Sequence, residues 1–181
     1  MKHTLALLTT LLLAPLTALH AADTTGGKPN IVLIFIDDMG YADIGPFGNK
    51  DVRTPNLDKF AAEGRKFTSF YATPVCSMSR ASLLTGCYNV RVSIPGVLFP
   101  KSNIGLHPDE ITLAEIVKAR GYATCAIGNW HLGHYPEFLP TRQGFDSYFG
   151  LPYSNDMQAG RNNMPPLPLY RDETVIETRT L

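Results

Sequence analysis

The stretch of this sequence best suited to chemistry is a cysteine followed four positions later by an arginine. Residues 74–86 read Pro-Val-Cys-Ser-Met-Ser-Arg-Ala-Ser-Leu-Leu-Thr-Gly. A short extended run precedes Cys76 and a helix-like segment follows it, which places Cys76 and Arg80 on one helical face. Helix N-terminal N–H groups and a guanidinium both stabilise anions. We therefore expect a nucleophile or an anion site, although a buried core cysteine fits the same residues.

A pair of carboxylates is the second chemical feature. Asp37 and Asp38 come directly after the apolar run Ile31-Val-Leu-Ile-Phe-Ile36, which predicts a central parallel strand buried on both faces. Open α/β sheets place their ligands at the carboxyl ends of such strands. A hard divalent cation, calcium or magnesium, relieves the repulsion between adjacent carboxylates. A solvated turn is the alternative for a bare Asp-Asp pair.

The third feature is a histidine behind another strand-like run. Residues 122–127 predict a buried strand, and Gly-Asn-Trp-His-Leu-Gly follows at residues 128–133. Because the unperturbed pKa of histidine is about 6.5, His131 could exchange protons near neutrality. A lone histidine is more often structural, so these residues alone leave both interpretations open.

Alternating strand and helix signals predict an α/β fold with a mainly parallel sheet flanked by helices. Thr112 and Glu115 form a capping box, and Pro55 after Thr54 marks another helix start. Residues 88–108, rich in Gly and Pro, predict a loop. The expected strands are 31–36, 66–73, 122–127 and a short one around 174–177, and the expected helices begin near residues 54, 76 and 112.

Composition and charge exclude some function classes. The 181 residues, 44% of them hydrophobic, allow one domain with a core. Sixteen basic residues balance sixteen acidic ones, so no bulk field attracts nucleic acid or an anionic membrane. Any anion must be bound by local placement of charge.

Residues 1–22 resemble a secretory signal peptide, with Lys2 and His3, an apolar run, and small residues at Ala21 and Ala22. The run is short for a membrane span, so we expect export to the periplasm or the exterior without a stable anchor. Three cysteines do not describe a disulfide framework, which leaves Cys76 for other chemistry.

The motifs together resemble the type I, formylglycine-dependent sulfatase family, arylsulfatase-like. Residues 76–86 resemble the signature C-x-P-x-R-x-x-x-L/T-G, with Met78 in the Pro position. Residues 121–133 resemble the second signature, G-Y-x-T-x-x-x-G-K-W-H-x-G, with Asn129 in the Lys position. The resemblance runs from Asn30 to the end, so residues 23–181 are expected to be the N-terminal part of a catalytic domain whose C-terminal part is missing.

This resemblance implies an alkaline-phosphatase-like sulfatase fold and hydrolysis of sulfate monoesters. A modifying enzyme would oxidise Cys76 to formylglycine. Asp37, Asp38 and the modified Cys76 would hold calcium, with magnesium possible. Arg80 would stabilise charge, His131 would move a proton, and Asn129 and Ser154 would contact a sulfated small molecule or glycan. The list of implied site residues is Asp37, Asp38, Cys76, Arg80, Asn129, His131 and Ser154.

Two departures from the family pattern keep other functions open. Met78 lies in the segment that the modifying enzyme reads, and Asn129 supplies no positive charge. A secreted, non-catalytic sulfatase remnant or binding protein is one alternative. A related phosphate or phosphonate ester hydrolase is the other.

Overall fold

The structure is a computed structural model that describes residues 27–159 and 163–179. It divides into two compact units, Met1–Met39 and Gly40–Leu181, and each is described by itself. The expected signal peptide, residues 1–22, lies outside the described residues. None of the helices in the described ranges is both long and apolar enough to cross a membrane.

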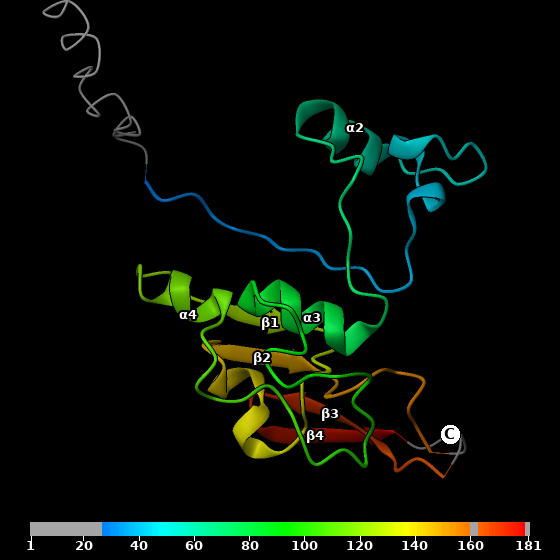
Figure 1. The fold of residues 1–181 in the computed structure, drawn as a ribbon. Helices are drawn as coiled ribbons and strands as arrows, with labels where there is room; N and C mark the ends of the chain where they lie inside the picture. Colours follow the sequence, from blue (N-terminus) through cyan, green and yellow to red (C-terminus); the bar gives the residue numbers. More distant parts are fainter. Residues whose placement is uncertain (1–26, 160–162, 180–181) are drawn as a thin grey trace, which may run out of the picture. The chain divides into compact units, whose positions relative to one another are not determined.

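In the first unit, residues 27–39 form neither helix nor strand, with a turn at Asp37 and Asp38 (Figure 1). The prediction of a buried strand at 31–36 is therefore wrong. The segment is also not buried, since Val32 is 81% exposed. A run of this kind becomes a buried strand only where neighbouring strands take up its backbone groups and other elements cover both faces. Residues 31–36 take part in none of the sheet pairings.

The second unit holds the regular elements (Figure 1). Its α-helices are α2 (Pro55–Glu63), α3 (Cys76–Thr85) and α4 (Leu113–Lys118). Its strands are β1 (Cys125–Ile127), β2 (Ser147–Gly150), β3 (Leu167–Arg171) and β4 (Thr174–Arg179). Its 3-10 helices are η2 (Tyr41–Asp43), η3 (Gly45–Phe47), η4 (Pro136–Phe138) and η5 (Pro140–Arg142).

The four strands form one mixed sheet in the order β1-β2-β3-β4. β1 and β2 pair in parallel, with Ala126 opposite Tyr148, while β2–β3 and β3–β4 are antiparallel. The α/β class is confirmed, with one parallel pairing where a mainly parallel sheet was expected. β1 was expected to be buried, but it is the first strand in the sheet order and its Ile127 is 80% exposed.

Residues 66–73 were expected to form a strand and do not. At Phe70, both backbone groups are bonded to one side chain. The Tyr41 hydroxyl donates to the carbonyl of Phe70 at 2.7 Å and accepts from the amide of Phe70 at 2.8 Å. It therefore occupies both backbone groups that a neighbouring strand would use.

The predicted helix starts are confirmed. α3 begins at Cys76 and ends before Gly86, whose φ of 68° is the left-handed conformation that glycine adopts without strain. Thr112 and Glu115 form the expected capping box of α4, with Thr112 N donating to Glu115 Oε2 at 2.7 Å. These signals act within one helical turn, which explains why the sequence reveals them.

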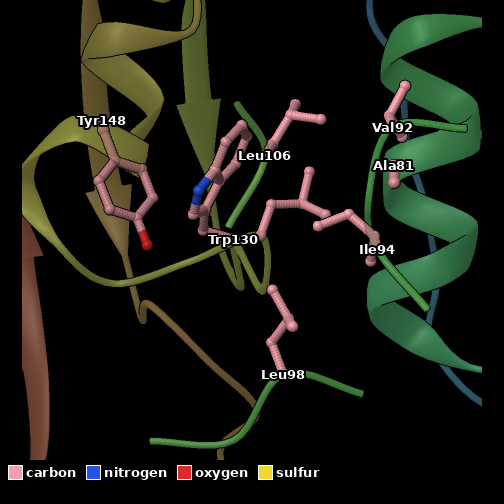
Figure 2. Packing of buried hydrophobic residues seen from close by; sticks show 8 residues of the cluster. Ala81, Val92, Ile94, Leu98, Leu106, Trp130 and Tyr148 are labelled. Carbon is pink, nitrogen blue, oxygen red and sulfur yellow. The ribbon is translucent and has the colours of Figure 1, made fainter. Parts of the chain in front are cut away.

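A hydrophobic core joins α3, the loop at 88–108 and the segment after β1 (Figure 2). Its buried members are Ala81, Val92, Ile94, Leu98, Leu106, Trp130, Leu132 and Tyr148. Half of this cluster comes from the loop, which has no helix or strand. The loop is thus part of the core even though its sequence carries no periodic pattern.

Beyond the ends of β1 and β2, the segments that follow these two strands stay paired through backbone hydrogen bonds. Gly128 N donates to Phe149 O at 2.9 Å, Leu151 N to Gly128 O at 3.3 Å, and Trp130 N to Leu151 O at 2.8 Å. This approach requires glycine, because a Cβ on Gly150 would lie 1.9 Å from the carbonyl oxygen of Gly128. The pairing holds residues 128–131 in register with residues 149–152.

We expect Gly150→Ala to destabilise the fold by forcing these backbones apart. Overpacking typically costs about 1–3 kcal/mol, and a clash with a carbonyl has no flexible side chain to absorb it. Chemical denaturation would measure the change in the free energy of unfolding. Gly96→Ala is the matched control, since a Cβ there meets nothing within 4 Å. Equal midpoints for the two variants would contradict this prediction.

An ion pair joins the last residue of α4 to the residue that precedes β2. Lys118 Nζ lies 2.6 Å from Asp146 Oδ1, and Thr124 donates to Asp146 Oδ2 from its amide at 2.9 Å and its hydroxyl at 3.1 Å. The hydrogen bond from Lys118, followed by those from Thr124, lowers the pKa of Asp146 from 3.8 to about 2. The carboxylate therefore stabilises the fold in its charged form.

For Asp146→Asn we expect a lower melting temperature than wild type near neutral pH. Because the folded-state pKa is depressed, the contribution is present above about pH 4 and is lost as the pH falls towards 2. The difference in melting temperature should therefore shrink on acidification. Asp156→Asn, on an exposed loop, is the control. A difference that stays constant down to the lowest pH at which both proteins fold would rule out this assignment.

Candidate active site

Cys76 is the first residue of α3, and Val75 before it is extended with φ −131° and ψ 158°. The amides of the first helical turn therefore lie beside Cys76, as an anion site requires. Cys76 is half-buried. Arg80 follows one turn later, so α3 places the predicted nucleophile and the predicted cation together.

Arg80 also joins the two sequence blocks. Its Nη1 donates to the backbone carbonyl of Asn129 at 2.6 Å. The contact uses the backbone of Asn129, so any residue at position 129 could accept it. Asn129 is half-buried, and its amide side chain brings no charge to this place. The tertiary structure thus brings Arg80 and Asn129 together across 49 residues of sequence.

His131 is 1% exposed and has a φ of 61°. Left-handed backbone at a residue other than glycine is strained and persists only where its surroundings enforce it. Here the amide of His131 donates to Pro152 O at 3.1 Å, and its Nε2 lies 2.8 Å from Leu98 O. Trp130 beside it donates from Nε1 to Phe138 O at 2.8 Å. Hydrogen bonds therefore hold both the backbone and the buried imidazole of His131 in place.

Ser154 lies in the loop after β2 and is half-buried. Its carbonyl accepts from the amide of Met157 at 3.0 Å. The neighbouring Tyr153 is buried and meets His134 edge to face at 6.0 Å between ring centroids. The backbone hydrogen bonds between residues 128–131 and 149–152 bring this loop towards the His131 segment. The role of Ser154 as a substrate contact stays a prediction.

Asp37 and Asp38 belong to the first unit, where both are exposed and Asp38 has a φ of 55°. Their hard oxygen donors suit calcium, but calcium takes about six to eight oxygens. Across residues 27–159 and 163–179 there is no group of three or more His, Cys, Asp or Glu side chains that could hold a metal ion. Asp37 and Asp38 as calcium ligands therefore stay a prediction.

Burial keeps the groups around the site neutral. The pKa of His134 is lowered by burial, so its imidazole is uncharged at neutral pH. Burial raises the pKa of the phenols of Tyr148, Tyr153 and Tyr170. Tyr148 donates to Gly128 O at 3.3 Å and so adds a hydrogen bond to the segment before Asn129.

Sequence reasoning missed three residues that shape the site. Tyr148 and Gly150 support residues 128–131 from β2. Leu98, in a loop without a periodic pattern, presents its carbonyl to His131. The Phe149-Gly150 block offered a signal for the glycine. No signal in the sequence indicated Leu98, because its contact is made by a backbone carbonyl.

Comparison with known proteins agrees with this geometry. The family model described as Sulfatase matches residues 29–178. Arylsulfatase A of Homo sapiens is 50% identical over 151 residues, which are 81% of this chain and 30% of that protein. N-acetylgalactosamine-6-sulfatase of Sus scrofa is 44% identical over 153 residues, 80% of this chain and 29% of that protein. The chain spans less than a third of the length of these relatives.

Solved structures show the same likeness. The crystal structure of Ps i-CgsB superposes with a TM-score of 0.73 at 33% identity, over 84% of this chain and 38% of that one. Its complex with k-i-k-neocarrahexaose gives a TM-score of 0.69 at 30% identity, over 80% and 36% of the two chains. The predicted sulfatase fold is thereby confirmed. The family model matches most of the chain, which shows that this chain belongs to the sulfatase family.

Proposed function

We propose that the protein hydrolyses sulfate monoesters in the manner of an arylsulfatase. The observation that carries this proposal is the hydrogen bond from Arg80 Nη1 to the carbonyl of Asn129 at 2.6 Å. It joins the Cys76 block to the His131 block, so the two signatures meet in one place. The family membership and the similarity to arylsulfatases support the same reaction class.

Cys76 is the proposed nucleophile precursor, oxidised to formylglycine by a separate modifying enzyme. Formylglycine would supply a hydrated aldehyde whose oxygen can attack sulfur while the ester S–O bond breaks and the alcohol or phenol leaves. Loss of inorganic sulfate from the modified side chain would then return the aldehyde. Arg80 and the first amides of α3 then stabilise the negative charge on the sulfate oxygens. His131 accepts or returns a proton at the nucleophile. Its rigid setting by Leu98 and Pro152 favours this role, since an oriented base loses little entropy in the reaction.

Asp37 and Asp38 are proposed as calcium ligands, with magnesium as the smaller alternative. Calcium would neutralise charge near the sulfate. Two carboxylates would supply only part of the about six to eight oxygens that calcium takes, so further ligands would complete the site.

The proposed substrate is a sulfated small molecule or a sulfated glycan, with Asn129 and Ser154 in contact with it. One relative is named for N-acetylgalactosamine 6-sulfate chemistry, and one structural neighbour is solved with k-i-k-neocarrahexaose. Both names favour a carbohydrate. We further propose export to the periplasm or the exterior through residues 1–22.

A non-catalytic, secreted binding protein is the second candidate. Asn129 favours it, because charge-assisted hydrogen bonds are about twice as strong as neutral ones and the Lys charge of the family is absent here. Met78 favours it as well, since it departs from the segment that is read during oxidation of Cys76. A related phosphate or phosphonate ester hydrolase would use the same anion site.

To test the proposed function, the full protein would be isolated from its natural source and assayed with an aryl sulfate beside the matching aryl phosphate. We expect turnover of the sulfate, and we expect the peptide holding residue 76 to have the mass of an aldehyde in place of a thiol. Cys76→Ala should abolish turnover, as a control for contaminating enzymes. A retained thiol without turnover would support the binding protein, and a preference for the phosphate would overturn the substrate class.

We expect Asn129→Lys to raise kcat/KM for the aryl sulfate. The backbone carbonyl that accepts from Arg80 is unchanged by this substitution, so the variant adds charge without removing the contact. Losing one transition-state donor typically costs about 10²–10³ in rate, which sets the size of the expected gain. Asn129→Met is the matched control, because methionine is similar to lysine in length but carries no charge. A Lys variant no faster than wild type would refute the role of this charge.

A further inference from the structure

An open pocket of about 330 Å³ is lined by Phe99, Lys101, Ser102 and Met164. Its volume falls within the range of small-ligand sites, which combine apolar walls with a few polar groups that orient the ligand. Here Phe99 and Met164 supply apolar surface, while Lys101 and Ser102 supply hydrogen-bond donors. None of these four side chains belongs to the candidate active site described above.

Two hydrogen bonds fix the turn that carries the donors. Ser102 N donates to Phe99 O at 2.8 Å, and Phe99 N donates to Ser102 Oγ at 2.8 Å. Pro100 occupies the second position of this turn, where its fixed φ is favourable. Because the two ends of the turn are bonded to each other, Lys101 and Ser102 extend from a defined backbone. A ligand bound there would have little main chain to order.

The polar groups of the pocket still have hydrogen bonds to donate. The Ser102 hydroxyl accepts from Phe99 N, so its own proton is left for another acceptor. Lys101 is exposed and has no carboxylate partner among the residues that the structure describes. An ammonium and a hydroxyl donor in one pocket favour an anionic ligand, because charge-assisted hydrogen bonds are the stronger kind.

The pocket adjoins the frame of the candidate active site. Leu98, directly before the turn, has its carbonyl 2.8 Å from Nε2 of His131. Val97 packs against the buried cluster that contains Tyr153, and Ser154 follows Tyr153 in the chain. The pocket therefore begins one residue after the carbonyl that contacts the proposed base, and its turn is anchored beside the loop of the proposed substrate contact.

We propose that this pocket binds a second sulfated sugar unit of the substrate, next to the unit whose ester is cleaved. The second sulfate accepts from Lys101 Nζ and Ser102 Oγ, and the C–H face of its sugar lies on Phe99 and Met164. A sulfated sugar offers an anionic group and an apolar face together, which neither a bare ion nor an uncharged sugar does. This inference rests on the proposed function, because it names a sulfated oligosaccharide as the substrate class of the same site.

Calorimetric binding to the full protein tests the proposal, with Cys76→Ala as the background so that no ligand is consumed. The probes are disaccharides of carrageenan and of N-acetylgalactosamine glycans, each prepared with a sulfate on both sugars and on one. We expect the second sulfate to raise the affinity of the better-bound disaccharide about 3–10-fold, the gain from a partly exposed charged contact. Lys101→Gln should remove this gain, and Lys101→Arg, which keeps the charge, should retain most of it.

Lys50→Gln is the matched control, because Lys50 is also exposed but does not line the pocket. It removes the same charge from the protein and should leave the gain intact. Equal affinity for the doubly and singly sulfated probes would overturn the proposal, and so would an equal loss in Lys50→Gln. Inorganic sulfate is the last probe. An effect of Lys101→Gln as large on this ion as on the second sulfate would replace the sugar site by a simple ion site.

Turnover of the aryl sulfate by the wild-type protein separates this inference from the proposed function. A protein that hydrolyses the aryl sulfate but gains no affinity from the second sulfate keeps the proposed function and refutes the pocket as a sugar site. A protein that shows the gain and its dependence on Lys101, without any turnover, refutes the hydrolase and leaves the pocket as a binding site for a sulfated sugar.

Discussion

The backbones of Gly128 and Gly150 pass so close that a Cβ on Gly150 would lie 1.9 Å from the carbonyl oxygen of Gly128. This approach lets the parallel pairing of β1 and β2 continue past the strand ends, to the bond between His131 N and Pro152 O at 3.1 Å. The continued pairing sets the backbone of residues 128–131. Every contact of Asn129 and His131 described above starts from that position.

From this position Asn129 meets Arg80 through its backbone. A carbonyl acceptor does not depend on the side chain, so the contact between the two signature blocks persists where the family Lys is replaced by Asn129. What changes is the local charge, because Arg80 then stands without a second cation from position 129. The backbone contact and the local charge are therefore separable at this position.

The irregular loop at 88–108 supplies four of the eight buried residues of the hydrophobic core cluster, whereas helix and strand supply two, Ala81 and Tyr148. Leu98 and Ile94 pack in the same cluster as Trp130. The amide of Leu98 donates to Ser77 and its carbonyl faces His131. A loop can do this because its buried backbone groups are satisfied by side chains in place of a ladder. The helix that begins at Cys76 and the strand that ends before Gly128 are thus joined through a segment without secondary structure.

The sequence by itself determined the family and the starts of the α-helices, and it predicted the residues of the site. Capping at Thr112 and the start of α3 at Cys76 are set within one turn by neighbours in the chain, so their signals are local. Motif residues such as Arg80 and His131 identify a chemistry by type and spacing alone.

Only the tertiary structure decided the strands and the contacts. A strand exists through partners far away in the chain, so the apolar run at 31–36 could not show by itself whether it would pair. The Tyr41 hydroxyl bonds both backbone groups of Phe70 from 29 residues away. The Arg80–Asn129 and Leu98–His131 contacts use backbone carbonyls, which every residue possesses. For that reason no residue pattern marks them, and the fold alone selects which carbonyl faces the site.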